Sequence, residues 1–308
     1  MARQQAQAGT PAQPKAMNQT IQGTFWILAT ALLWSALGLL GKTCLTAGMP
    51  PLESAFFRAF FGCSAFFIHC AVSGHLRIPA IDAAKMMLFG AWGIGAYFAF
   101  MQYTILLAGA AMDIVLQYTA PFWVALFAWW FFGERLTRVK AIAIAAAAAG
   151  TVCVCLSGGS IPGPVSYIGI VTGLLSGLCY ATQFPFTRWG QKRYSPDVLF
   201  AWMLAGGTLV LGALNAAVVP FRIDFPPAVW MASLSMGVLC TYLAFICYAK
   251  ALERISLVQA VVTAELEPVL SMLWVWLAFN ESFSPIGWIG SALIVLSVLF
   301  MSLFKSNA

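Results

Sequence analysis

The chain has 308 residues, of which 61% are hydrophobic and only 8% are charged, and its net charge is +6. A soluble domain carries about 25% charged residues, so this composition excludes an ordinary soluble protein. The mean hydropathy of +0.87 indicates an integral membrane protein.

Residues 1–22 form a polar leader rich in Gln, Ala and Pro. Such a segment cannot bury enough apolar surface to fold alone, so we expect this cytoplasmic leader to be disordered. The apolar segment that follows is too long for a removable signal peptide and lacks the flanking residues of a cleavage site. We therefore expect residues 23–43 to remain in the protein as the first membrane helix.

Ten apolar segments follow one another, each close to the length of about 20 residues that a helix needs to cross a hydrocarbon core. They cover residues 23–43, 52–72, 84–106, 112–132, 138–156, 165–187, 197–218, 228–250, 257–279 and 284–304. The connections between them are too short to hold a folded soluble domain, which needs on the order of 50 residues. The sequence therefore predicts an all-α integral membrane protein with ten transmembrane helices.

The basic residues predict the orientation of these helices, because short loops rich in Lys and Arg stay on the cytoplasmic side. With the amino terminus inside, thirteen of the 16 basic residues lie on that side, Lys42 and Arg222 lie outside, and Arg58 lies within a span. We therefore expect a multi-pass protein of the cytoplasmic (inner) membrane with both termini in the cytoplasm. The basic residues are spread over several loops, which argues against nucleic acid as a partner.

The eight cysteines lie mostly within apolar segments, where a free thiol behaves as a small hydrophobic side chain. None shows the paired CxxC spacing of a zinc site, so we expect no metal and no cofactor. The sequence also lacks an HExxH metalloprotease motif, a GxxxxGK[ST] nucleotide-binding loop and a GxSxG nucleophile elbow. These observations argue against an enzyme and against the direct use of ATP.

One pattern occurs twice in the chain. The segment YTAPFWVALFAWWFFGERLT at residues 118–137 aligns with ELEPVLSMLWVWLAFNESFS at residues 265–284. The residues that recur 147 positions apart are Pro121 and Pro268, Trp129 and Trp276, and Glu134 and Glu281. Upstream, YFAFMQY starting at Tyr97 aligns with YLAFICY starting at Tyr242, at an offset of 145. The alignment indicates a duplicated unit.

The two units cover residues 23–156 and 165–304, and each holds five predicted helices. Because five is odd, the second unit enters the membrane from the opposite side. Inverted repeats related by a pseudo-two-fold axis in the membrane plane are typical of secondary transporters, whose substrate site lies near the midplane between the repeats. A channel-like or non-transport membrane protein is the alternative from a different class.

Two quoted segments resemble the EamA-type branch of the drug/metabolite transporter superfamily. LLWSALGLLGKTCLTAGMPPLESAFFRAFFG resembles its first two helices, and AELEPVLSMLWVWLAFNESFSPIGWIGSALIVLSVLF resembles its last two. The matching residues are Trp34, Lys42, Pro51, Arg58, Glu267, Pro268, Glu281, Gly287 and Gly290. The resemblance implies a ten-helix carrier of small metabolites, often amino acids or drugs, that usually works outward. The chain departs from the pattern at Ala120, Asn280 and Glu265.

Glu265 and Glu267 occupy the apolar segment 257–279, and Glu267 lies roughly 15 Å from its start, near the midplane. A charge at that depth is costly, so it should face a wet cavity or a partner. Two positions on a regular helix are about 200° apart, so we expect one carboxylate to face the pathway and the other to be paired or protonated. Glu267 either makes a structural hydrogen bond or handles substrate or protons, and Glu265 could attract an ammonium group. Pro268 bends this helix, and we expect it and its repeat mate Pro121 to act as hinges.

Arg58 and Lys42 are the basic candidates for the pathway. Arg58 either snorkels or forms a structural pair, or its planar fork recognises a carboxylate. Lys42 either anchors the outer end of the first helix or guides an anion. The remaining candidates are polar or aromatic residues within predicted spans: Trp34, Tyr97, Gln102, Gln117, Tyr118, Tyr180, Gln183 and Tyr242. Most residues of this kind serve packing or aromatic belts, and Tyr97 and Tyr242 rank highest because their repeat positions match.

Together these features predict a secondary transporter that exports small metabolites, amino acids or related amines, across the cytoplasmic membrane by alternating access. A multidrug or nucleotide-sugar-type carrier of the same superfamily is the alternative. The expected partners are a small-molecule substrate and the lipid bilayer, with proton coupling through Glu265 or Glu267. A monomer and a homodimer are both compatible with the sequence.

Overall fold

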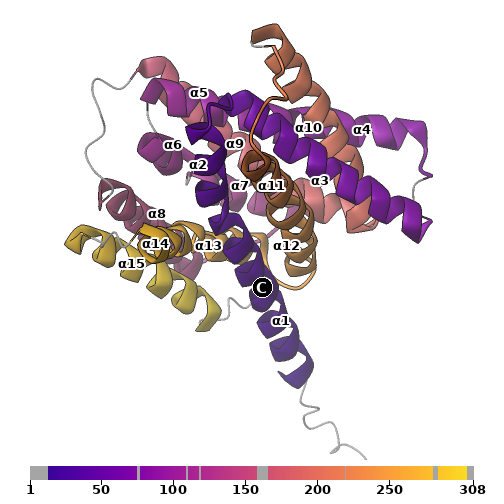
Figure 1. Cartoon of the computed structure of the whole chain (residues 1–308). Helices are drawn as coiled ribbons and strands as arrows, with labels where there is room; N and C mark the ends of the chain where they lie inside the picture. The colour runs from indigo at the N-terminus through magenta and orange to yellow at the C-terminus, as the bar shows by residue number, and fades with distance from the viewer. Residues whose placement is uncertain are drawn as a thin grey trace, which may run out of the picture.

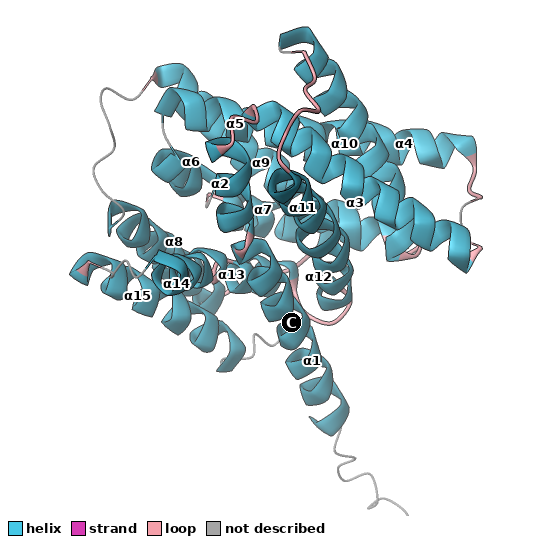
Figure 2. Ribbon diagram, viewed as in Figure 1, coloured by secondary structure: helices cyan, strands magenta, loops and turns pink. Residues whose placement is uncertain are grey.

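The computed structural model describes residues 13–74, 77–108, 110–117, 119–157, 166–218, 220–279 and 284–303. Over these ranges the chain is helical and contains no strand (Figures 1 and 2). The prediction of an all-α protein is confirmed. In an apolar solvent the backbone must satisfy its own hydrogen bonds, and a helix does so within one segment.

Nine helical elements belong to the first half of the described chain. They are α1 (Gln13–Ser35), α2 (Leu37–Thr46), α3 (Pro51–Ser73), α4 (Ala80–Gly90), the π-helix η1 (Ala91–Ala96), α5 (Tyr97–Ala108), α6 (Ala110–Gln117), α7 (Ala120–Phe132) and α8 (Arg138–Ser157). Several of them are pieces of one predicted span, since α4, η1 and α5 follow each other directly.

The second half repeats this order with fewer interruptions among the residues described. Its elements are α9 (Tyr167–Gly190), α10 (Pro196–Val218), α11 (Pro227–Gly237), the π-helix η2 (Val238–Leu243), α12 (Ala244–Leu252), α13 (Leu257–Ala264), α14 (Glu267–Phe279) and α15 (Pro285–Leu303). Each of the ten predicted segments therefore contains helix.

Seven of the described helices are long and apolar enough to cross a membrane, and Pro285–Met301 is a shorter apolar helix. The predicted segments 138–156 and 257–279 are not among the seven, although both are helical. The second of them is divided into helices of 8 and 13 residues, each shorter than a membrane crossing. By length and composition, the helices in the described ranges therefore account for seven crossings.

The first helix begins earlier than the sequence suggests. We expected residues 1–22 to be disordered, but α1 starts at Gln13, so the last part of that leader is helical. Residues 1–12 lie outside the described residues. The polar turns from Gln13 to Gln22 contain Lys, Ala, Met and Gln, which are good helix formers and extend a helix that the membrane segment has already nucleated.

The irregularities of the two halves occur at matching positions. The π-helices η1 and η2 start at Ala91 and Val238, which are 147 positions apart, like the prolines of the repeat. α7 and α14 each begin one residue before a proline, Pro121 and Pro268, after a break in the preceding helix. Proline lacks an N–H and clashes with the carbonyl four residues earlier, but it fits the first turn of a new helix. The predicted bend is therefore a full break, present in both repeats.

Helices from equivalent places in the two repeats pack against each other. α3 lies along α10 and α8 lies along α15, as Figure 1 shows for the rose and yellow helices α8 and α15. The α8–α15 contact is close, because a Cβ on Gly150 would lie 2.7 Å from the carbonyl oxygen of Gly290. Only a residue without a side chain permits this approach. A cavity lies between the repeats, and α3 also contributes to its lining.

Candidate functional site

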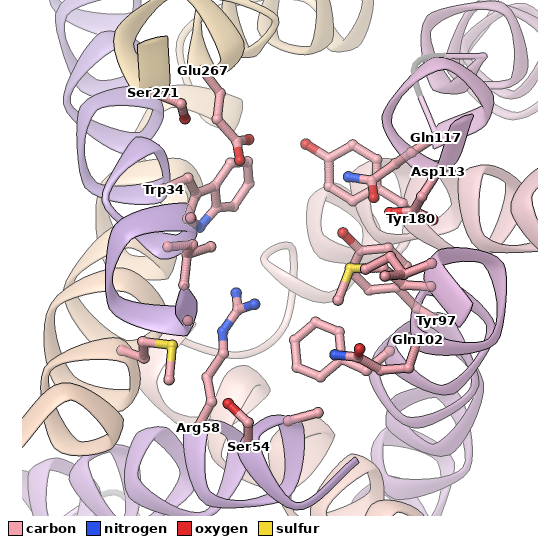
Figure 3. Close-up of a pocket in the computed structure, with 18 of the residues that line it drawn as sticks. Trp34, Ser54, Arg58, Tyr97, Gln102, Asp113, Gln117, Tyr180, Glu267 and Ser271 are labelled. Carbon is pink, nitrogen blue, oxygen red and sulfur yellow. The ribbon is translucent and has the colours of Figure 1, made fainter. Parts of the chain in front are cut away.

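A cavity of about 620 Å³ lies between the two repeats. Its volume is within the range of 300–1,000 Å³ that is typical of small-molecule sites. Its wall is largely apolar, with polar side chains converging from several helices (Figure 3). The polar, charged and aromatic lining residues are Trp34, Lys42, Ser54, Arg58, Tyr97, Phe98, Gln102, Asp113, Gln117, Tyr180, Gln183, Phe245, Glu267 and Ser271.

Arg58 on α3 extends into this cavity with its guanidinium group foremost (Figure 3). Its Nε donates to Thr241 Oγ1 at 3.1 Å, and its guanidinium carbon lies 4.5 Å from the centre of the Phe98 ring. Thr241 belongs to η2, and its hydroxyl donates in turn to the carbonyl of Met236, five residues earlier, at 3.0 Å. The π-helix thus orients the threonine that holds one edge of Arg58. The arginine is fixed in a direction that presents a fork to a ligand.

Glu267 faces the cavity from the opposite wall (Figure 3). It is the first residue of α14, which starts there because of Pro268. A helix N-terminus carries a partial positive charge and stabilises a carboxylate. Glu267 and Arg58 carry opposite charges and face the same cavity although they come from different repeats. The cavity therefore has a basic and an acidic side.

Two tyrosines and two amides form a third wall. Tyr97 and Tyr180 stack with ring centres 5.5 Å apart, and Gln102 and Gln117 lie beside them in Figure 3. Gln183 also lines the cavity, but its Nε2 donates to the carbonyl of Gly93 in η1 at 2.7 Å. Its amide nitrogen is therefore used by the fold, and its role is in part structural.

Asp113 on α6 is a lining residue that the sequence analysis did not single out. Its side chain is buried, with 4% exposure, and its Oδ1 has no hydrogen-bond partner among the residues described. The sequence contains a pattern that identifies Asp113 as a candidate, because an acidic residue inside an apolar segment indicates a functional position. Asp113 is the second residue of the predicted fourth span, residues 112–132.

Three of the predicted site and hinge residues do not line the large cavity: Glu265, Tyr242 and Pro121. Glu265 is 1% exposed, and within the described part of the chain neither of its oxygens has a hydrogen-bond partner. It borders a separate void of about 10 Å³, together with Pro121, Gln117, Tyr180 and Glu267. This is about the space of one water molecule. The void lies directly behind the cavity wall, because three of its residues line both spaces.

Tyr242, which ranked high among the candidates, points elsewhere. Its hydroxyl lies 3.1 Å from Nδ1 of His69, and its ring packs against Phe66 with centres 4.8 Å apart. The π-helices η1 and η2 are offset by 147 positions, so the structure places Ala244, and not Tyr242, at the position equivalent to Tyr97, which lines the cavity. The predicted pairing of Tyr97 with Tyr242 at an offset of 145 is therefore wrong. Tyr118 and Glu281, singled out above, lie outside the described residues.

The cavity has an accessible end and a closed end. It extends to Lys42 and Leu45 near the end of α2, and Leu45 is 46% exposed. At the other end, Trp34 and Phe245 form the floor, with ring centres 6.2 Å apart. Tyr248 packs behind them, 5.9 Å from the Trp34 ring. All three aromatic residues are buried.

Beyond this aromatic floor, Glu134 joins the two repeats. Gly133 ends α7 with a left-handed φ of 66° and directs the chain so that Glu134 turns back into the bundle. Its Oε1 accepts hydrogen bonds from Arg188 Nη1 at 2.8 Å and from the Leu257 backbone N–H at 3.2 Å. Its Oε2 accepts from Lys140 Nζ at 3.3 Å. We call these four residues the Glu134 cluster.

Arg188 strengthens this cluster. Its Nη2 and Nε donate to the carbonyl of Leu252 at 2.8 and 3.2 Å, and Nη2 also donates to the carbonyl of Ile255. The guanidinium group therefore satisfies the free carbonyls at the end of α12 while it neutralises a carboxylate of the other repeat. The cluster links the two repeats at this end of the molecule.

Comparison with known proteins supports the family resemblance that was based on the first two and the last two predicted helices. The EamA-like transporter family matches residues 21–156 and 167–303. An uncharacterized transporter of Archaeoglobus fulgidus is 26% identical over 82% of this chain and 87% of its own length. A probable terminal-alkyne amino-acid exporter of Streptantibioticus cattleyicolor is 23% identical over 74% of this chain and 76% of its own.

A third relative, the pseudopaline exporter CntI of Pseudomonas aeruginosa, is 25% identical over 92% of this chain and 97% of its own. A solved crystal structure superimposes with a TM-score of 0.78 at 22% identity, covering 90% of this chain and 95% of that one, which establishes a shared fold. The family matches nearly the whole chain in two consecutive units, as the resemblance predicts. The chain is a membrane transporter and belongs to the EamA-like transporter family.

Proposed function

We propose that this protein exports small zwitterionic metabolites, amino acids or related amines, across the cytoplasmic membrane by alternating access. The observation that carries the proposal is the pair of opposite charges across the cavity, Arg58 on one wall and Glu267 on the other. A planar guanidinium suits a carboxylate, and a carboxylate suits an ammonium group. Because both charged groups lie in a low-dielectric bundle, a ligand that neutralises both is favoured over one that neutralises neither.

Alternating access is supported by the unequal ends of the cavity. The Glu134 cluster and the aromatic floor close one end, and the cavity reaches exposed residues at the other. In an inverted repeat, rocking one unit against the other exchanges the closed and open ends. The breaks before Pro121 and Pro268 are the proposed hinges, because a helix without continuous hydrogen bonds bends there at low cost.

The proposed topology has ten crossings with both termini in the cytoplasm. It follows from the basic residues of the loops and from a helix in each predicted segment. In this orientation the cavity faces outward and the Glu134 cluster closes the cytoplasmic side. The family match in two consecutive units supports a repeat of five helices each.

Proton coupling is assigned to Glu265. Glu265 is 1% exposed and has no donor within the part of the chain that the structure describes. An ionised carboxylate in such surroundings is very costly, so this side chain keeps its proton in the conformation described here. Rocking of the repeats moves the α13–α14 break and brings Glu265 into contact with water, where it releases the proton.

Two relatives support the class of substrate. One is named a probable terminal-alkyne amino-acid exporter and another a pseudopaline exporter. Both names describe an exporter, and the first names an amino acid as what is exported. Neither name identifies the substrate of this chain.

The test is efflux from proteoliposomes loaded with amino acids, amines, drug-like cations and nucleotide sugars, followed by mass spectrometry against protein-free liposomes. Selective loss of amino acids or amines is the expected result. Selective loss of drug-like cations or nucleotide sugars instead would indicate a multidrug or nucleotide-sugar-type carrier. Passive loss of all small solutes would indicate a channel.

A further inference from the structure

The proposed pair of Arg58 and Glu267 leaves two charged residues of the cavity unused, Asp113 and Lys42. Asp113 lines the same cavity on the tyrosine wall, close to Gln117 and Tyr180 in Figure 3. Asp113 and Gln117 are four residues apart on α6 and therefore share one face of that helix. Both side chains belong to the same side of the cavity, away from Arg58.

Asp113 is built into the site as a buried acceptor. Its side chain is 4% exposed, and Oδ1 is unpartnered within the part of the chain that the structure describes. Most buried carboxylates in proteins are hydrogen-bonded or paired, because an unsatisfied one costs several kcal/mol. Oδ1 itself is enclosed by the protein, so a cationic ligand would compensate the charge of Asp113 through the part of the carboxylate that lines the cavity.

The other charges of the cavity do not compensate Asp113. Arg58 is fixed on the other side by Thr241 and Phe98. Lys42 is at the accessible end and already has an interaction of its own. A ligand with one carboxylate and one ammonium group would neutralise Arg58 and Glu267 and would still leave Asp113 without a positive partner.

We infer that Asp113 binds a second cationic group of the substrate, so that the cavity selects dibasic zwitterions: one carboxylate at Arg58 and two positive groups at Glu267 and Asp113. This inference rests on the proposed function and narrows its substrate class. A cavity of about 620 Å³ has room for a substrate that spans all three positions. Gln117 offers a neutral amide beside the second cation and adds an acceptor for its remaining N–H groups.

The probe pair is arginine and citrulline. They have the same length and shape, but arginine ends in a guanidinium and citrulline in an uncharged ureido group. Proteoliposomes loaded with equal amounts of both compounds should release arginine about tenfold faster or more, because the charge pair with Asp113 is formed only by arginine. In Asp113→Asn, which keeps the shape of the side chain, the ratio of the two rates should fall to about one.

Asp224→Asn is the matched control. Asp224 is exposed on the loop between α10 and α11, and the same substitution there should keep the wild-type ratio. Thermal stabilisation of the wild-type protein provides a second measurement that does not depend on folding of the variant. Arginine should raise the melting temperature more than citrulline at equal concentration.

Equal rates for arginine and citrulline in the wild-type protein would overturn the assignment of Asp113 and leave zwitterion export standing. A wild-type ratio that persists in Asp113→Asn would overturn it as well. Release of neither compound, together with release of a different class from the mixed pool, would overturn both the inference and the proposed function.

Discussion

Glu134 and Asp113 are two acidic side chains of the first repeat that the fold treats in opposite ways. Glu134 receives hydrogen bonds from Arg188, Lys140 and a backbone N–H. Asp113 is more deeply buried, and its Oδ1 has no partner among the described residues. A carboxylate with all its donors supplied by the protein holds two repeats together, whereas one without them is ready for a ligand. The hydrogen-bonding surroundings, and not the residue type, therefore decide whether an acidic side chain links the repeats or is available to a ligand.

The largest expected effect is a loss of efflux on substitution of Arg58, which lies in the proposed binding cavity. Arg58→Ala should lower the efflux of the zwitterionic substrate about 100-fold, because losing a desolvated, charge-assisted pair costs about 3 kcal/mol. Arg58→Lys keeps the charge but loses the planar fork, so its efflux should fall about tenfold. Rates are measured in proteoliposomes at equal protein content.

Arg222→Ala serves as the control for Arg58. Arg222 forms an exposed pair with Asp224, and its removal should not change efflux. If Arg58→Ala transports at the wild-type rate while it remains folded, the carboxylate is not bound at Arg58.

The next effect concerns the closed end. Glu134→Gln keeps the size of the side chain but removes the charge that pairs with Arg188 and Lys140, at a cost of about 2 kcal/mol. The backbone N–H of Leu257 then loses its charged acceptor. Hydrogen exchange in the segment from Leu252 to Leu257 should become faster by about tenfold or more, as measured by mass spectrometry.

Glu253→Gln is the matched substitution for this experiment. Glu253 pairs with Arg254 at 2.9 Å near the surface, where such a pair contributes less than about 1 kcal/mol. Exchange in the same segment should stay near the wild-type rate. Equal exchange in both variants would show that the Glu134 cluster does not close this end.

A smaller effect is expected at Glu265, which has no hydrogen-bond donor among the described residues and does not line the large cavity. Glu265→Gln cannot exchange a proton, so the acceleration of efflux by an imposed proton gradient should fall about tenfold. Efflux is compared with and without the gradient. A response equal to that of the wild-type protein would remove Glu265 from the proton path, and Glu267→Gln would then be tested in the same way.

The smallest effect is expected on the exposed loop. The hydrogen bond from Arg222 lowers the pKa of Asp224. A lowered folded-state pKa stabilises the protein above the ordinary Asp pKa of about 3.9, and this stabilisation is lost as the pH falls below that value. Because the pair is exposed, Asp224→Asn should not measurably change the melting temperature at neutral pH. A clear decrease would show that this loop supports the fold.

The sequence predicted which residues belong to the site better than it predicted where their side chains point. Arg58, Glu267, Tyr97 and Tyr180 were candidates because polar side chains are rare and expensive inside apolar segments. The same argument applied to Glu265, which the structure places behind the wall. On a broken helix the direction of each side chain depends on the packing of α13 and α14 against their neighbours, and no sequence spacing fixes that.

The sequence by itself determined the membrane class, the helical segments, the duplication and the family. Each of these rests on local properties, because an apolar solvent forces every segment into a helix and a repeat is visible as recurring residues. Only the tertiary structure decided that Asp113 lies at the cavity and that Glu134 receives three donors from α8, α9 and α13. Those assignments depend on contacts between residues that are distant in the chain, and such contacts exist only once the two repeats have packed together.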